Sequence, residues 1–311
     1  MTVELLDRKL LFVTGKGGVG KTTIAASLAL LAAQQGRRTL VGEVDAKGNL
    51  ADFFEVGPTA FKEREVSRNL WAMSMSTEDS LKEYLSLQLK IPLVARLGPL
   101  ARTFDFVANA APGVKEILTI GKFVWEVRER HYDLVVVDAS ATGHIIGQLA
   151  APQSIQELVQ VGLVRDQTDW MLDILGDPTR TGAVIVAAPE EMPVNETLEL
   201  VTRLRDETVV DLAAVVANRV LPELFTRREE KIFERLPAAA LAQAIGGPVQ
   251  PLLDGAQLAV TLRRTRGVHL ARLRRELPPE VPLLYVPYLF QRTHGARATH
   301  QVAEHLQEEL T

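Results

Sequence analysis

A glycine-rich segment near the start of the chain carries the residue types that bind a row of phosphates. It follows the apolar residues 10–13 and satisfies the pattern G-x-x-x-x-G-K-[ST]. In this pattern, backbone N–H groups surround the phosphates, the lysine reaches the terminal phosphates and the hydroxyl ligates Mg²⁺. The sequence therefore predicts a nucleoside triphosphate site. Its residues are Gly15, Lys16, Gly17, Gly18, Val19, Gly20, Lys21, Thr22 and Thr23.

Two aspartates stand where expected strands end. Asp138 closes the apolar run 134–138, and beside a phosphate loop such a residue is expected to hold Mg²⁺, usually through water. Asp45 follows the run 39–44 and is expected to orient or deprotonate an attacking water. Each has a simpler interpretation, an Asp that opens a turn or caps a helix. Ligands bind at the carboxyl edge of open α/β sheets, which favours the functional interpretation.

The elements that must position these residues alternate between strands and helices. This rhythm predicts an α/β fold of the P-loop NTPase type, with a doubly wound, mainly parallel sheet of about seven strands. A helix after the phosphate loop is expected to end near Gly36. We expect one ATPase domain over residues 1–311, with an inserted helical subdomain formed by about 77–132 and 154–176. The expected strands are residues 9–14, 39–44, 70–74, 134–138, 183–187, 213–217 and 283–286.

Composition narrows the class of protein. The 311 residues are 47% hydrophobic and 24% charged, which is ordinary for a globular protein. A net charge of −4 argues against nucleic acid as a partner. The absence of cysteine excludes disulfides, thiolate zinc sites and iron–sulfur clusters. No signal peptide or membrane-spanning run is recognisable, so we expect a cytoplasmic protein without stable membrane insertion.

Lys16, a second lysine directly after the first glycine, carries a family resemblance. It marks the branch of P-loop ATPases that includes partition, septum-site and arsenite-pump ATPases and the nitrogenase iron protein. Residues 138–144 resemble switch II of the arsenite-pump and tail-anchored-protein-targeting ATPases, and residues 45–50 resemble their switch I. Residues 189–197 and 216–219 resemble two further segments of that sub-branch. The likeness extends from residue 9 to about residue 290.

The resemblance implies roles for single residues. Lys16 would reach across a dimer interface to the partner's phosphates, and Asp45 would be the catalytic carboxylate. Glu190 would contact nucleotide near the interface, and Asn218 would bond adenine. Thr22 and Asp138 would hold Mg²⁺. An Asn after a buried strand offers a donor and an acceptor to a base edge, although an ordinary turn Asn is the simpler alternative.

The sequence also departs from the family pattern. Ala46, Lys47 and Gly48 replace the Pro, Ala and His that are common in switch I, which puts the geometry around the attacking water in doubt. The zinc-binding Cys-x-x-Cys pair and the arsenite-binding cysteines are absent, so we expect no thiol-based zinc or arsenite binding.

The predicted function is a Mg-dependent ATPase working as a nucleotide-gated dimer, either with itself or with a paralogue. Apolar residues of the insert would pack in the core or form a groove for a hydrophobic helical client: Leu85, Leu87, Leu89, Leu93, Val94, Leu97, Leu100, Phe104, Phe106 and Val107. An arginine-rich helix over residues 256–277 is expected to face solvent, with an acidic partner or an anionic lipid surface as the alternatives. One alternative is a positioning ATPase acting on DNA or membrane, which the Glu-rich residues 301–310 disfavour. The other is a non-hydrolysing regulatory subunit.

Overall fold

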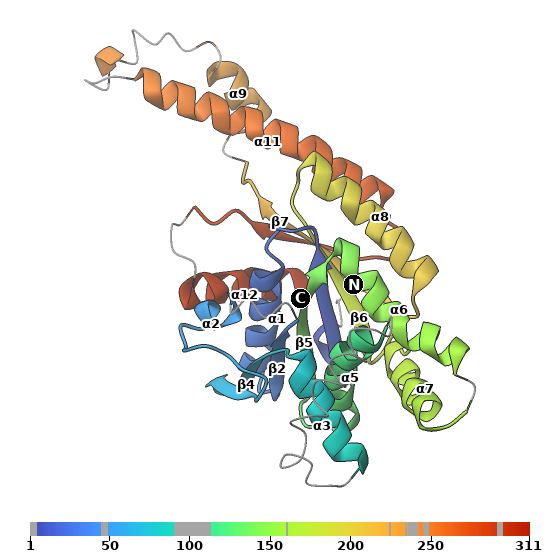
Figure 1. Ribbon diagram of the computed structural model, residues 1–311. Helices are drawn as coiled ribbons and strands as arrows, with labels where there is room; N and C mark the ends of the chain where they lie inside the picture. Colours follow the sequence, from blue (N-terminus) through green and yellow to red (C-terminus); the bar gives the residue numbers. More distant parts are fainter. Residues whose placement is uncertain are drawn as a thin grey trace.

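One sheet organises the chain, with strand order β3-β4-β2-β5-β1-β6-β7-β8 (Figure 1). The computed structural model describes residues 5–44, 49–89, 113–159, 161–223, 225–233, 235, 242–244, 249–290 and 295–311. Only β3, in the described part, runs antiparallel to its neighbour; the other pairings are parallel. The predicted doubly wound α/β fold is confirmed. The strands are β1 Leu10–Gly15, β2 Thr39–Glu43, β3 Arg64–Ser67, β4 Leu70–Ser74, β5 Leu134–Ala141, β6 Thr181–Ala187, β7 Leu212–Val220 and β8 Leu283–Pro287.

Helices cover both faces of the sheet, and a short 3₁₀ turn at Leu5–Asp7 precedes β1. Helices α1, α2 and α12 share one apolar core with the sheet. Helices α5, α6, α7 and α8 share the core on the other face. The helices are α1 Lys21–Gln34, α2 Asn49–Phe53, α3 Thr77–Leu89, α5 Val114–Arg128, α6 Thr142–Leu158, α7 Leu163–Leu175, α8 Glu191–Glu207, α9 Arg227–Phe233, α11 Gln250–Glu276 and α12 Ala296–Leu310.

The continuous apolar strands are explained by these two cores. Successive side chains of a strand point to opposite faces, so a strand covered on both faces must be apolar throughout. In β1, Leu11 and Val13 enter the core with α1, whereas Leu10 and Phe12 enter the core with α5. All four are fully buried. The central position of β1, between β5 and β6, fixes the phosphate loop at the middle of the sheet.

Helix α1 is buried on every side over residues 24–33, because it lies between the sheet and α12. A helix that is apolar all round must be enclosed in this way. The core therefore holds α1 in place along most of its length, and with it the phosphate loop that joins its start. The C-terminal helix α12 provides the outer cover through Val302, Ala303 and Leu306.

Three expectations need correction. Strand β3 was missed, because Arg64–Ser67 is mostly exposed and has no apolar run. The helical connection expected over 154–175 is two helices, α6 and α7, and α6 already begins at Thr142. The arginine-rich helix α11 begins six residues earlier than expected, at Gln250. It extends beyond the sheet, with α9 along its outer part (Figure 1).

The predicted client groove depends on residues that the structure does not describe. Residues 90–112 and the side chains of 84–89 lie outside the described part of the chain, and with them all ten apolar residues of the insert. The division into an ATPase domain and a helical subdomain stays a prediction. Among the described helices, none is both long and apolar enough to cross a membrane.

Candidate functional site: the phosphate loop at the carboxyl edge of the sheet

The predicted phosphate loop joins the carboxyl end of β1 to the start of α1. Gly20 occupies the N-cap position of α1 with φ 97°, and its carbonyl accepts the first helical hydrogen bond from Ile24 N at 3.1 Å. The first turn of a helix directs N–H groups and a partial positive charge outward, which suits an anion. Among the described residues, a Cβ added at Gly17 or Gly18 would meet no atom within 4 Å. The loop thus leaves room where phosphates would lie.

Asn218 supports the loop from the end of β7. Its side-chain Nδ2 donates to the Val19 carbonyl oxygen at 2.8 Å, and its Oδ1 accepts from Arg219 N at 2.9 Å. The residue is buried, and a Cβ at Gly20 would come within 2.4 Å of the Asn218 Nδ2. Asn218 therefore braces the loop in this structure. Its predicted hydrogen bond to adenine stays a prediction.

The two predicted magnesium residues are in contact. Thr22 Oγ1, on the first turn of α1, donates to Asp138 Oδ2 at 2.6 Å. Asp138 is buried in β5, which pairs directly with β1. A hydroxyl and a carboxylate are the hard oxygen ligands that Mg²⁺ prefers, and they adjoin the open part of the loop. The residues present fit a Mg²⁺–phosphate ligand.

The two lysines of the loop have different surroundings. Lys21 Nζ lies 3.5 Å from the backbone oxygen of Lys16 and thus remains at the loop. Lys16 turns away and forms an ion pair with Glu196 of α8 in the same chain. Both side chains of this pair are about 30% exposed, at 30% and 29%. Glu196 also accepts a hydrogen bond from Thr142 Oγ1, at 3.3 Å, at the start of α6.

Glu190, the predicted nucleotide contact, precedes α8 and is exposed. Arg266 of α11 donates to its Oε1 at 3.0 Å. Five residues further along α8, Asn195 Oδ1 accepts from Arg272 Nη1 at 2.6 Å. The first turns of α8 are thus joined to α11 on one side and to the phosphate loop on the other.

Asp45, the predicted catalytic carboxylate, and residues 46–48 lie outside the described part of the chain. The strand before them ends at Glu43, which is in register with Asp138. The chain therefore leaves β2 at the same edge as the phosphate loop. Glu43 is itself buried at this edge, where Ser74 Oγ lies 3.5 Å from its Oε2.

Sequence reasoning assigned no role to Glu196 or Thr142. Both fall inside segments that carried the family resemblance, and that was their only signal. Glu196 stands 180 positions from Lys16 in the chain, so no local pattern could join them. Residue type and spacing found the loop but not the partner of its second lysine.

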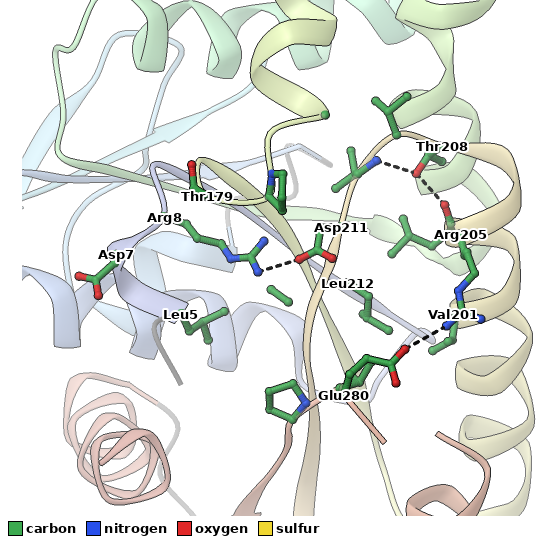
Figure 2. Close-up of a pocket in the computed structure, with 18 residues that line it drawn as sticks. Leu5, Asp7, Arg8, Thr179, Val201, Arg205, Thr208, Asp211, Leu212 and Glu280 are labelled. Atoms are coloured by element: carbon green, nitrogen blue, oxygen red, sulfur yellow. Dashed lines mark hydrogen bonds and ion pairs between the residues drawn. The ribbon is translucent and has the colours of Figure 1, made fainter. Parts of the chain in front are cut away.

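A separate pocket opens at the opposite edge of the sheet (Figure 2). It has a volume of about 860 Å³ and is lined by residues that precede β1, β6, β7 and β8. Four of its charged side chains form two pairs: Arg8 with Asp211 at 2.7 Å and Arg205 with Glu280 at 3.9 Å. Among the predicted site residues that the structure describes, none lines it. This pocket is therefore separate from the predicted nucleotide site at the phosphate loop.

The sequence is similar to a known family and to several of its members. The family model described as anion-transporting ATPase matches residues 8–168 and 160–236. ATPase BagA of Mycobacterium tuberculosis is 31% identical over 225 residues, 69% of this chain and 66% of that protein. A putative arsenical pump-driving ATPase of Halobacterium salinarum is 30% identical over 243 residues, 71% of this chain and 37% of that protein. ATPase GET3 of Podospora anserina is 30% identical over 162 residues, 50% of this chain and 48% of that protein.

The chain thus spans 66% or less of the length of these three relatives. The family match nevertheless covers the loop, the Thr22–Asp138 contact, Glu196 and Asn218. It includes the strands from β1 to β7 and therefore most of the sheet. The chain belongs to the anion-transporting ATPase family.

Proposed function

We propose that this chain is a Mg²⁺-dependent ATP hydrolase whose nucleotide cycle changes the association of two chains. The observation that carries the proposal is the 2.6 Å contact between Thr22 and Asp138 beside the glycine loop. Backbone N–H groups of the loop and Lys21 would bind the phosphates. Mg²⁺, held by Thr22 and Asp138, would neutralise charge that develops on the terminal phosphate.

Two further residues complete the proposed chemistry. Asp45 would orient the attacking water and accept its proton, since the chain leaves β2 at the loop edge. Lys16 would stabilise the transition-state charge of a second chain's nucleotide, as an arginine finger does. Its side chain is 30% exposed at the surface, where a second chain has access to it. The partner would be an identical chain or a paralogue.

The proposed output is the opening and closing of a surface for a hydrophobic helical client. Support comes from the resemblance of switch II, residues 138–144, to the tail-anchored-protein-targeting ATPases. A thiolate site for arsenite is not part of the proposal, because the chain has no cysteine. Pull-down of an apolar helix with and without ATP tests this output, and binding that ignores nucleotide would contradict it.

The hydrolytic proposal is tested by two substitutions in the pure chain. Lys21→Ala should abolish MgATP binding, whereas Asp45→Asn should bind MgATP with near-normal affinity and lose turnover by about 100-fold or more, as expected for a general base. Lys9→Ala is the matched control, because Lys9 is exposed at the other end of β1. Its binding and turnover should equal those of the wild type.

Each outcome separates the proposal from an alternative. Normal hydrolysis by the Asp45→Asn variant would remove Asp45 from the mechanism. MgATP binding without any turnover by the wild-type chain would instead favour a regulatory subunit. Binding is measured by calorimetry, and turnover by phosphate release.

A further inference from the structure

The loop lysine that would serve a second chain is held by its own chain. Lys16 Nζ pairs with Glu196 Oε1, and both residues are only partly exposed. To bind phosphates on a second chain, the Lys16 ammonium would have to move away from this carboxylate on its own chain. Releasing Lys16 therefore costs the free energy of its ion pair with Glu196.

Glu196 is well placed for this role, because neighbouring elements fix it. Its second oxygen accepts from Thr142 at the start of α6, at 3.3 Å. The residue before it, Asn195, is held by Arg272 of α11 at 2.6 Å. The carboxylate thus contacts two neighbouring segments, the phosphate loop and the start of α6, and the residue before it is anchored to α11.

We propose that Glu196 is a positioning residue. It keeps Lys16 bound within its own chain until nucleotide phosphate displaces the Glu196 carboxylate from the lysine. This inference rests on the proposed nucleotide-dependent dimer. A triphosphate brings several negative charges to the loop and competes with the single carboxylate for Lys16. Partly exposed ion pairs are weak enough to be exchanged in this way. Nucleotide binding would then release the lysine for the partner chain.

Glu196→Gln tests the proposal, because an amide keeps the shape and can still accept from Thr142 but cannot form the ion pair. We expect nucleotide-dependent dimerisation to need about fivefold less protein, as expected for loss of one weak, partly exposed pair in each of the two chains. The measurement is sedimentation velocity with Mg²⁺ and a non-hydrolysable ATP analogue. In a Lys16→Ala background, the same substitution should have no effect.

Glu191→Gln is the matched control, since it removes the same charge from the same helix at an exposed position. It should dimerise like the wild type. If Glu196→Gln matches this control, the proposal is overturned. It is also overturned if the effect persists without Lys16, because Glu196 would then act only by repelling the analogue.

A second measurement needs no dimer. In the nucleotide-free chain, Glu196→Gln should raise the acetylation rate of Lys16 severalfold relative to Lys9, read by mass spectrometry. An unchanged ratio overturns the holding contact. If the ratio rises but the wild-type chain never dimerises, the proposed dimer fails and Glu196 has no role in releasing Lys16 to a partner.

Discussion

Gly20 occupies a position of the phosphate loop that a residue with a Cβ can take only at a cost in stability. Its φ of 97° is costly for residues with a Cβ, and an added Cβ would come within 2.4 Å of Asn218 Nδ2. We expect Gly20→Ala to lower the free energy of unfolding by about 3 kcal/mol, combining backbone strain with overpacking. Displacing Asn218 would also break its hydrogen bond to Val19. Urea unfolding measures the loss.

Gly36 provides the control for this prediction at the other end of the same helix. It has φ 86°, but an added Cβ would meet no atom of the described residues within 4 Å. Gly36→Ala should therefore lose only the backbone contribution, about 1 kcal/mol. Equal losses for the two variants would show that Asn218 moves aside without cost and does not brace the loop.

Among single residues, the sequence located Thr22 and Asp138, whose positions depend on neighbouring strands. Thr22 and Asp138 meet because the phosphate-loop pattern and a strand-ending Asp both belong to the carboxyl edge. The Lys16–Glu196 ion pair could not be predicted, because it depends on how α8 packs over the loop. Such a contact follows from tertiary packing, and residue type gives no indication of it.

Among the elements, α5 carries an ion cluster that fastens it to its neighbours. Lys122 is 4% exposed and lies 2.8 Å from Glu126, 3.0 Å from Glu83 of α3 and 3.0 Å from Glu63. Burial alone would lower the pKa of Lys122, but the hydrogen bonds and charges of Glu126 and Glu83 raise it above its ordinary value. The ammonium group therefore stays charged at neutral pH, and the carboxylates depend on it.

Lys122→Met should consequently destabilise the chain by about 3 kcal/mol, because the buried Glu126 carboxylate loses the ammonium group and keeps only the His131 ring nitrogen, at 2.7 Å, as a described side-chain partner. Chemical denaturation at pH 7 measures the change. Lys82→Met is the matched control, since Lys82 pairs with Glu78 and Asp79 in the open. Its unfolding midpoint should not change measurably. A midpoint equally unchanged for Lys122→Met would mean that water already screens the cluster.

The elements that the sequence predicted well are those with a strong pattern. Buried strands such as β5 and β6 are continuous apolar runs, and the structure confirms them. Strand β3 has no such run, because it is an exposed edge strand that pairs on one side with β4. The start of α6 at Thr142 was not predicted. Weak local signals fail where tertiary contacts decide the element.

For the whole molecule, the pattern of strands and helices predicted the class of fold, but it predicted neither the sheet order nor the projection of helix α11 beyond the sheet. That order places β1 between β5 and β6 and so brings Thr22 to Asp138. It also leaves Lys16 at the surface edge, 30% exposed. Whether Lys16 serves its own nucleotide or a second chain's is a question about the assembly.

Complementation between two inactive chains answers that question. Lys16→Ala and Asp45→Asn should each lose turnover alone. In a mixed dimer, the site of the Lys16→Ala chain keeps its own Asp45 and would receive Lys16 from the partner. Random mixing of equal amounts should therefore restore about a quarter of wild-type phosphate release, since half of the dimers are mixed and each has one of its two sites complete. A Lys16→Ala chain mixed with the Lys16→Ala/Asp45→Asn double variant supplies no lysine and should stay inactive. If the first mixture also stays inactive while sedimentation shows that mixed dimers form, Lys16 acts within its own chain, and the exchange from Glu196 to phosphate takes place inside a single subunit.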